Sequence, residues 1–437
     1  MIKRVLTTGL IIGFSFSALK AQQNETLSLS VKEAEKYAIE HNYLIKNASL
    51  DVKKAEATKW YAISTMLPQV NGTLDYNNYL GYEITMKIPS PVQGYPPTEV
   101  QIPMNPTSNL TIQASITISG AQIVSATLGK LAVEMSKTNH QKTEQNIKAQ
   151  VRTLYFSALA MEKTVELLTQ SMDDMQKLEK ITQNAVSVGV SEQTAADQIS
   201  VQVSSLQNNL NSIKRTSEML YNSMRLLLGI SVDAQIVLTE NIENILNVEN
   251  TNKLLNESFL LTNNLDYKLV EMNAELSKKQ LRINEWAYGP TLSGFYRYQE
   301  KIQKTDFDMN PPQVIGFSVN IPIFSSGSKY AKVLEAKCTY KSALNNMDMV
   351  SEQLKIQDRQ LRYNLRSNME NYETQKKNIE VSQRVFNNIS NKYEQGYVAS
   401  MEVTNSSMNL ISAQSNYIQS MLSLITAQIE LEMLLNK

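Results

Sequence analysis

Four short stretches of the chain alternate apolar and polar residues. The alternation is clearest in residues 109–118, where Leu, Ile and Ala alternate with Thr, Gln and Ser, and it recurs in 69–77, 291–299 and 313–323. Because successive side chains of a strand point to opposite faces, this period predicts strands with one apolar face and one polar face. Such strands fit the wall of a membrane β-barrel, although a half-buried soluble sheet would show the same alternation.

Apolar residues spaced by threes and fours predict helices over most of the remaining chain. The sequence has neither proline nor glycine between Gly129 and Gly189, nor from about Lys329 to Gln395. A helix of about 65 residues would be roughly 100 Å long. The narrow apolar stripe indicates long helices packed side by side as coiled coils, with water on both broad faces.

The first helix of the mature chain has a recognisable start and end. Ser30 is a candidate N-cap, and Glu33 three residues later completes a capping box. Periodic apolar positions then continue toward Leu67, where Pro68 is predicted to end the helix and begin the first strand. We expect Pro290 to mark the same helix-to-strand junction later in the chain.

The chain reads as a tandem duplication. Three groups of residues recur at matching intervals: Pro68, Gly72 and Tyr76 with Pro290, Gly294 and Tyr298; Asn42 with Asn264; Gly189 and Leu227-Leu228 with Gly396 and Leu434-Leu435. The first repeat spans 22–228, with strands at about 69–79 and 109–119 and a helical hairpin with its tip at Gly189. A linker spans 229–262. The second repeat spans 263–437, with strands at about 291–299 and 313–323 and a hairpin tip at Gly396.

The N-terminus has the features of a secretory signal peptide. Lys3 and Arg4 precede an apolar run from Val5 to Ala18 that is too short to span a bilayer. We expect cleavage after Ala21, so that residues 1–21 are removed; a retained N-terminal anchor helix is the alternative. No later stretch is long and apolar enough for a membrane helix. The sequence therefore predicts an exported protein.

Charge and composition exclude several functions. The 42 basic and 42 acidic residues balance, which argues against a general nucleic-acid binder. The two histidines, His41 and His140, are far apart, and Cys338 is the only cysteine. A lone cysteine so far from the signal excludes an intramolecular disulfide and a lipid-modified cysteine at the cleavage site. No nucleotide or metal motif is present, so we expect no enzyme activity and no cofactor.

Four strands cannot close a barrel in a membrane, where exposed strand edges are prohibitive. If the chain spans a membrane, it must therefore oligomerise. Each strand pair is joined by a turn-rich loop; residues 80–106 hold six of the eleven prolines, and 300–312 end in Pro311-Pro312. These loops would lie at one end of the barrel and the helices at the other.

The order of these elements resembles the TolC family of outer membrane efflux proteins. The resemblance covers essentially all of the mature chain: signal peptide, then twice a helix, a proline-led strand, a loop, a strand, a very long helix, a glycine turn and a helix ending in Leu-Leu. It implies a mainly α-helical fold with a small β part, in which three chains form a twelve-stranded barrel in the outer membrane of a Gram-negative bacterium. An α-helical barrel would continue it through the periplasm.

The resemblance also implies a function and partners. The protein would be the passive exit duct of a tripartite efflux or type I secretion system. Its partners would be two further copies of itself, a periplasmic adaptor, outer membrane lipid, and an inner membrane transporter of resistance-nodulation-division or ABC type. A periplasmic adaptor or a structural coiled-coil protein of the envelope is the alternative, but no lipoyl-like or sandwich segment supports an adaptor, and the alternating strands disfavour a coiled coil.

The resemblance implies two functional sites. Adaptor contacts are expected at the hairpin tips: Val188, Gly189 and Val190 in the first repeat, and Gln395, Gly396 and Tyr397 in the second. The first tripeptide is similar to the tip of the family, whereas Gln395-Gly396-Tyr397 departs from the frequent Val-Gly-Thr. A glycine at either tip would also serve as a helix cap.

The second of these sites is a periplasmic aperture. The family often has a carboxylate six residues after the second tip glycine and another three further on, which correspond here to Glu402 and Asn405. Tyr393 matches a position that holds the tip closed. Three copies of Glu402 would form a ring that attracts cations. The alternative is an exposed glutamate that the helix dipole favours. In the first repeat, Ala195 replaces the acid. The linker would form a belt around the helical barrel.

Overall fold

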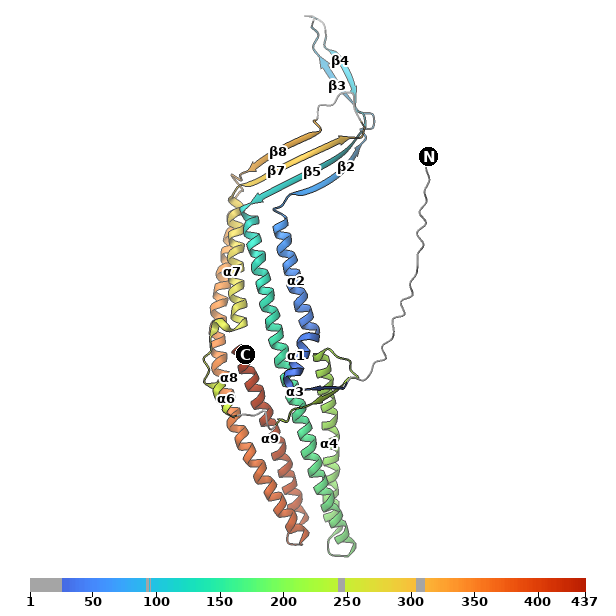
Figure 1. Ribbon diagram of the computed structural model, residues 1–437, viewed down its shortest axis with the longest axis vertical. Coiled ribbons are helices and arrows are strands. Elements are labelled where there is room, and N and C mark those ends of the chain that lie inside the picture. Colours follow the sequence, from blue (N-terminus) through green and yellow to red (C-terminus); the bar gives the residue numbers. More distant parts are fainter. Residues whose placement is uncertain (1–25, 92–93, 95, 243–247, 304–310) are drawn as a thin grey trace, which may run out of the picture. The chain divides into compact units, whose positions relative to one another are not determined.

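A computed structural model describes residues 26–91, 94, 96–242, 248–303 and 311–437 (Figure 1). The predicted signal peptide, residues 1–21, lies outside the described residues. The described chain is mainly helical with a smaller strand part, which confirms the predicted fold class. It divides into two compact units, and three of the long helices contribute a segment to each. No helix in the described ranges has the length and hydropathy needed to cross a bilayer.

The first unit, formed by residues up to 42, 150–247 and 372–425, contains both hairpin tips. Its helices are α1 (Val31–His41), α4 (Gln193–Leu228) and parts of α3 (Gly120–Ser187), α8 (Ser328–Glu394) and α9 (Ser400–Leu434). Strand β1 (Thr26–Leu29) pairs in parallel with β6 (Gln235–Leu238), the start of the predicted linker. The phenol of the fully buried Tyr155 donates a hydrogen bond of 2.9 Å to the Leu29 carbonyl, which ties α3 to this small sheet.

The capping box at the start of α1 is confirmed. The Ser30 hydroxyl accepts from the Glu33 backbone N–H, and the Glu33 carboxylate accepts from the Ser30 N–H at 2.8 Å. These backbone and side-chain hydrogen bonds lower the pKa of Glu33. The helix does not continue to Leu67 as predicted, because Asn42 is extended at ψ 134° and separates α1 from α2 (Tyr43–Ser64).

The second unit comprises residues 43–149, 248–371 and 426–437. Besides α2 and parts of α3, α8 and α9, it contains α6 (Val248–Leu255), η1 (Leu261–Asn263), α7 (Leu265–Glu285), η2 (Trp286–Tyr288) and strands β2 to β5, β7 and β8.

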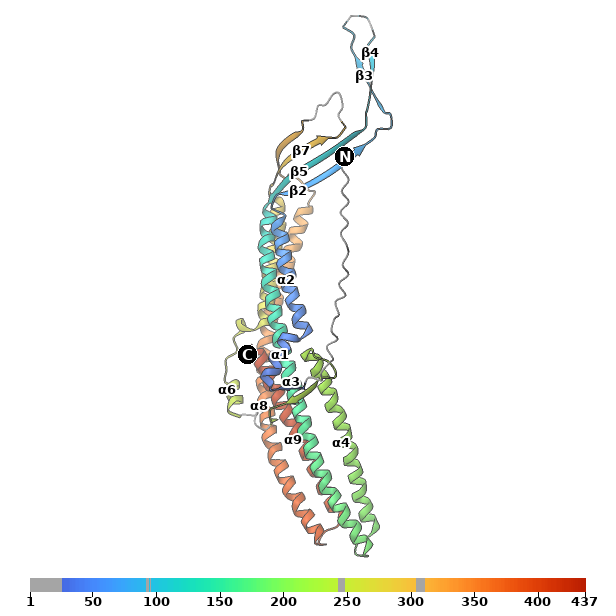
Figure 2. The ribbon, with the colours of Figure 1, turned by 45° about the vertical axis from the view of Figure 1, so that its right-hand side comes forward.

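The main sheet has four antiparallel strands in the order β2-β5-β7-β8, which lie side by side in both ribbon views (Figures 1 and 2). The strands are β2 (Gln69–Asn77), β5 (Thr107–Ser119), β7 (Thr291–Lys301) and β8 (Gln313–Asn320). The β5–β7 pairing joins the two repeats. β8 stops before the predicted end at 323, and Pro322, which lacks an N–H, follows two residues later.

The register places most of the apolar positions of the four strands on one face; Phe295 and Val314 lie on the other. Ile112 pairs with Gly72 on one side and with Tyr298 on the other, and Leu292 pairs with Ile118 and Val319. Paired residues share a face, so the apolar alternation of each strand adds to one continuous surface. The opposite face carries the polar positions of the four strands.

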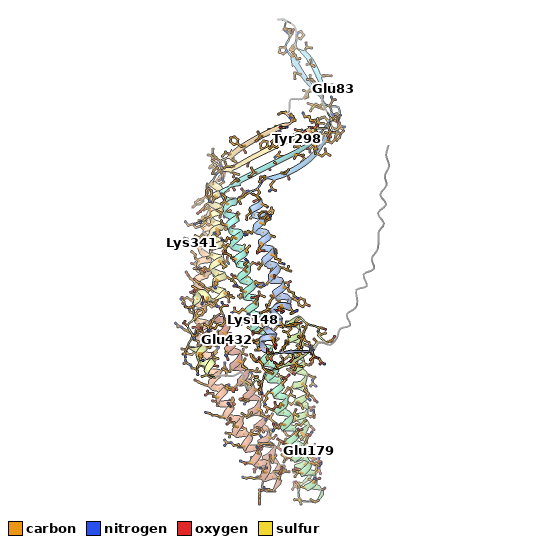
Figure 3. The ribbon with its side chains drawn as sticks, in the orientation of Figure 1. Glu83, Lys148, Glu179, Tyr298, Lys341 and Glu432 are labelled. Carbon is orange, nitrogen blue, oxygen red and sulfur yellow. The ribbon has the colours of Figure 1, made fainter. Side chains whose placement is uncertain are left out.

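Residues 80–106 differ from the predicted loop. β3 (Glu83–Ile88) and β4 (Thr98–Pro103) pair as a separate antiparallel ribbon, and Figure 3 labels Glu83 at its start. Lys87 and Glu99 form a cross-strand ion pair of 2.9 Å. The six prolines led us to predict a loop without strands. Five of them lie outside β3 and β4, and Pro103 is the last residue of β4, where a missing N–H is tolerated.

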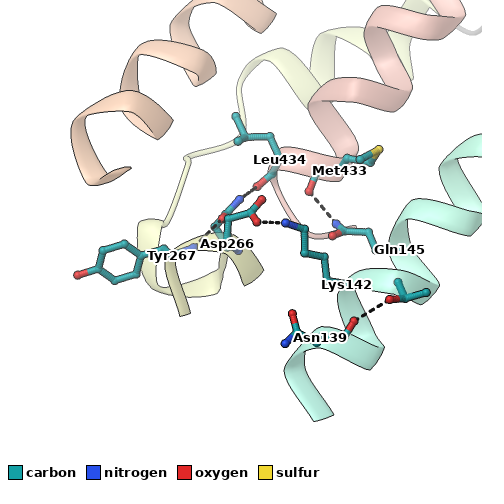
Figure 4. A network of polar contacts seen from close by, with 9 residues as sticks. Asn139, Lys142, Gln145, Asp266, Tyr267, Met433 and Leu434 are labelled. Atoms are coloured by element: carbon teal, nitrogen blue, oxygen red, sulfur yellow. Dashed lines mark hydrogen bonds and ion pairs between the residues drawn. The ribbon is translucent and has the colours of Figure 1, made fainter. Parts of the chain in front are cut away.

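A polar network holds the end of α9 against α3 and α7 (Figure 4). Lys142 of α3 pairs with Asp266 in the first turn of α7, and Gln145 Nε2 donates a hydrogen bond of 2.7 Å to the Met433 carbonyl. Asn264 caps the N-terminus of α7 by accepting from the N–H groups of Asp266 and Tyr267. These bonds satisfy backbone groups that helix ends leave without helical partners.

Candidate functional site: the hairpin tips

Both hairpin tips are built by the same backbone motif. Gly189 and Gly396 have φ of +76° and +79°, the left-handed region that glycine adopts without strain. Beyond Gly189, the Val190 N–H donates to the Ala185 carbonyl; beyond Gly396, the Tyr397 N–H donates to Lys392 in the same way. This is the Schellman arrangement, in which a glycine after the last turn closes the orphan carbonyls of a helix.

The tip side chains are open to solvent. Val188, Val190 and Tyr397 are 73%, 81% and 77% exposed, and Gln395 is exposed as well. A Cβ placed on Gly189 or Gly396 would meet no atom within 4 Å. The positive φ angle, and not a lack of space, is therefore the reason for glycine at both tips. The neighbouring apolar side chains are exposed at both turns.

Behind the tips, the two hairpins pack through one apolar cluster. Its buried members come from α3, α4, α8 and α9: Leu168, Met175, Leu178, Ile199, Leu206, Leu210, Phe386, Val403 and Leu410. The cluster joins the hairpin of one repeat to that of the other. Burial of this surface, at roughly 25 cal/mol per Å², is the main term that holds the hairpins together.

Tyr393 lies at the edge of this cluster and links the hairpins by a hydrogen bond. Its hydroxyl is 2.7 Å from Thr182 Oγ1, and Thr182 is 1% exposed. The Thr182 hydroxyl already donates to the Leu178 carbonyl at 2.8 Å. Since a threonine has one hydroxyl proton, Tyr393 must be the donor toward Thr182.

Two more polar contacts cross between the repeats. Ser400 Oγ donates to Gln198 Oε1 at 3.1 Å, and Ser171 Oγ donates to Gln414 Oε1 at 3.3 Å. The sequence alone did not single out Thr182, Gln198, Ser400, Ser171 or Gln414 as contacts between the repeats. Gln414 occupies the position of Gln207 when the two repeats are aligned on their tip glycines, yet Gln207 is exposed and bonds to Asn211 on its own helix.

Glu402 and Asn405 lie on the exposed side of α9. Glu402 is in the first turn of the helix, while Val403 and Ser406 next to these residues are buried. In the first repeat, Ala195 is half-buried, and Asp197 is exposed and accepts a hydrogen bond of 2.9 Å from Gln193. The structure brings Tyr393 into the contact between hairpins but leaves Glu402 and Asn405 facing outward from a single chain.

The remaining predicted positions lie at the junctions with the sheet. Pro68 and Pro290 each directly precede a strand, β2 and β7. In the first repeat the helix ends at Ser64, four residues before Pro68; in the second, η2 separates α7 from Pro290.

The described residues do not form a metal-binding group. No cluster of His, Cys, Asp or Glu within the described ranges could hold a metal ion. His41 stacks on Tyr37, His140 lies 3.7 Å from Glu144 of its own helix, and Cys338 is exposed on α8.

Comparisons with solved structures identify the fold. The chain is similar to the outer membrane protein VceC from Vibrio cholerae, with a TM-score of 0.74 and 14% identity over 93% of this chain and 95% of that one. The similarity to CusC has a TM-score of 0.77 and 15% identity, with 95% of each chain covered. The CmeC outer membrane channel of Campylobacter jejuni gives 0.75 and 14%, over 100% and 94%. Identities this low establish the fold alone.

A search of curated protein sequences finds no significant match. The family model described as outer membrane efflux protein matches residues 36–229 and 258–437, most of the chain. The presence of two matched segments fits the predicted duplication. The chain therefore belongs to the outer membrane efflux protein family.

Proposed function

We propose that this protein is the outer membrane exit duct of a tripartite efflux or type I secretion system. The observation that carries the proposal is the four-stranded sheet, whose strands have one apolar and one polar face and lead directly into very long helices. Family and fold are those of channel proteins and not of enzymes. They do not favour the adaptor or structural coiled-coil alternatives.

The sheet supports a trimer because it cannot close by itself. In the described part of the chain, β2 and β8 each pair on one side only, which leaves two open edges. Unpaired edges are prohibitive in lipid. The four strands alternate in direction, so β8 of one copy meets β2 of the next in the antiparallel sense. Three copies would give twelve strands and no remaining edge.

The two faces of the sheet suit a channel wall. Leu74, Leu110 and Ile112 belong to the apolar face, which would contact lipid. The opposite face carries Asn71, Thr73 and Gln113, which would line a water-filled lumen. Transport through such a duct is passive, and its energy comes from a partner.

Glu402 is the proposed aperture residue, with Asn405 one turn further on. In a threefold arrangement three Glu402 carboxylates would form a ring that favours cations and resists anions. Opening would separate the hairpins near the tip. The Tyr393–Thr182 and Ser400–Gln198 hydrogen bonds oppose this separation, because both join the hairpin of one repeat to that of the other.

The exposed tips are the proposed docking surface for a periplasmic adaptor, through which an inner membrane transporter of resistance-nodulation-division or ABC type would deliver substrate. Val188 and Val190 supply apolar contacts in the first repeat, and Tyr397 supplies an aromatic one in the second. Exposed aromatic and aliphatic side chains of this kind are frequent anchors of protein interfaces.

Conductance of the purified full chain in planar bilayers tests the proposal. We expect discrete, cation-selective pores, with selectivity reduced in Glu402→Ala and open time increased in Tyr393→Phe. Glu373→Ala, an exposed carboxylate on α8, is the matched control. A folded trimer that forms no pores, either as wild type or as Glu402→Ala, would contradict the channel assignment. Pores with unchanged selectivity would remove Glu402 from the aperture but leave the channel.

A further inference from the structure

Large aromatic side chains surround the places where the helices meet the sheet. Six of them are exposed or about half-exposed: Trp60, Tyr61, Trp286, Tyr288, Phe324 and Tyr330. They come from the end of α2, from η2, from the β8–α8 connection and from the first turn of α8. We call these six residues the collar. Ile323, beside Phe324, is 95% exposed, so the apolar surface here has no partner within the described chain.

Packing fixes part of the collar in place. A Cβ added to Gly120, the first residue of α3, would lie 2.1 Å from Trp286 Cε3, so the indole ring rests directly on the bare glycine backbone. Gly289 approaches the same ring, at 2.9 Å for an added Cβ. Two glycines thus make room for one tryptophan, which still remains half-exposed.

Basic residues accompany the collar. In the three helical turns next to each strand, residues 54–64, 120–130, 275–285 and 328–338, the sequence has nine lysines or arginines and four glutamates. The chain as a whole is balanced, with 42 residues of each sign. Positive charge is therefore concentrated at this level. Lys341, one turn beyond the last segment, is also exposed on α8 (Figure 3).

One contact joins the aromatic and basic elements. Lys329 Nζ lies 5.6 Å from the centre of the Tyr288 ring, within the range of a cation–π interaction. Lys332 and Arg282, next to the collar on α8 and α7, are exposed. Since this arrangement leaves cationic groups beside amphipathic rings, it fits a surface where an apolar phase, a polar phase and negative charge meet.

We propose that the collar and its basic residues bind anionic phospholipid in the leaflet that faces the helices. The inference rests on the proposed function, which puts the sheet in a bilayer. Tryptophan and tyrosine rings settle at the level of the lipid headgroups, and Lys329, Lys332 and Arg282 pair with the phosphates. The surface thus sets the height of the sheet in the membrane and selects lipid by charge.

The chain supplies its own probe, because its two tryptophans, Trp60 and Trp286, both belong to the collar. Full-length protein is reconstituted in phosphatidylcholine vesicles that contain either brominated phosphatidylglycerol or brominated phosphatidylcholine at equal mole fraction. We expect the tryptophan fluorescence to be quenched about twofold more by the anionic lipid. The variant Arg282→Gln/Lys329→Gln/Lys332→Gln should lose this preference, while Lys376→Gln/Lys377→Gln, exposed lysines far along α8, should keep it.

Equal quenching of the wild type by both lipids would overturn the proposal. Quenching by neither lipid would also overturn it and would point to a second copy of this chain as the cover of the collar. Conductance measured on the same vesicles separates these results from failure of the proposed function, since pores can form without a lipid preference. If the triple variant lacks the helical circular dichroism of the wild type, the single variant Lys332→Gln, expected to show a partial loss, replaces it.

Discussion

The side-chain amide of Asn264 donates a hydrogen bond of 3.1 Å to the main-chain carbonyl of Leu434, the last residue of α9. The first repeat contains the same bond, in which Asn42 donates at 2.7 Å to the Leu227 carbonyl near the end of α4. Both asparagines are 4% exposed. The duplicated asparagine and Leu-Leu motifs of the sequence therefore meet in space, where they close the end of each hairpin.

Replacing the buried Asn264 should destabilise the second unit. Asn264→Ala removes the cap of α7 and leaves the Leu434 carbonyl without this donor, and each loss costs about 1 kcal/mol. We expect the free energy of unfolding, measured by circular dichroism in a denaturant titration, to fall by about 2 kcal/mol in total. Asn273→Ala, exposed in the middle of α7, is the control and should be neutral or slightly stabilising. An Asn264→Ala protein as stable as wild type would show that the bond contributes nothing.

The glycines at two helix ends, Gly189 and Gly229, should differ in their tolerance of a side chain. Gly229 has φ of +71°, and an added Cβ would lie 2.7 Å from the His41 carbonyl oxygen, whereas Gly189 has a similar φ and open space. We expect Gly189→Ala to cost about 1 kcal/mol from backbone strain alone, and Gly229→Ala to cost clearly more. Thermal unfolding of the two variants checks the order.

Asparagine offers a finer comparison at the tip. Asn436, the second residue after the end of α9, already adopts φ of +59°. Gly189→Asn should therefore be better tolerated than Gly189→Ala, because asparagine enters the left-handed region more readily. Equal losses for the two variants would mean that the angle at Gly189 is not what the glycine provides.

The Tyr393–Thr182 bond should show measurable coupling between the hairpins. In a double-mutant cycle with Tyr393→Phe and Thr182→Val, we expect an interaction of about 1 kcal/mol in unfolding free energy. Ser171→Ala combined with Tyr393→Phe is the control, because Ser171 bonds to Gln414 and not to Tyr393. Additive effects of Tyr393→Phe and Thr182→Val would show that the hydroxyl does not hold the hairpins together.

Alkaline pH should destabilise the first unit through Tyr221. Burial, and then the hydrogen bond to the Glu162 carboxylate, raise the pKa of this phenol well above its usual value. Its stabilisation is fully present below the unfolded pKa of about 10 and declines as pH rises above it, since only the unfolded chain then releases the proton. Burial also raises the pKa of Tyr155. We expect unfolding temperatures to fall with pH above about 10, and less steeply in Tyr221→Phe. Tyr363→Phe, at an exposed position on α8, should retain the wild-type slope.

The periodic elements of the fold could be read from the sequence because they depend on local spacing. The alternation in residues 109–118 predicts β5, and the long segments free of proline and glycine predict α3 and α8. The ribbon of β3 and β4 was missed, although Ile84, Met86 and Ile102 alternate in the same way. The nearby prolines favoured a loop over a strand, although the alternation favoured a strand. The pairing of Ile84 with Ile102 shows that the alternation was the better guide.

For this protein, the sequence alone determined the repeat, the helices, the four main strands and the glycine turns, because these follow from spacing and from backbone preferences within a few residues. Only the tertiary structure decided which side chains meet across the repeats. Thr182 and Tyr393 carry no local signal for each other, and Asn42, where the helix breaks, bonds to a carbonyl 185 residues away. Such partners are chosen by packing, which brings distant residues within hydrogen-bond distance.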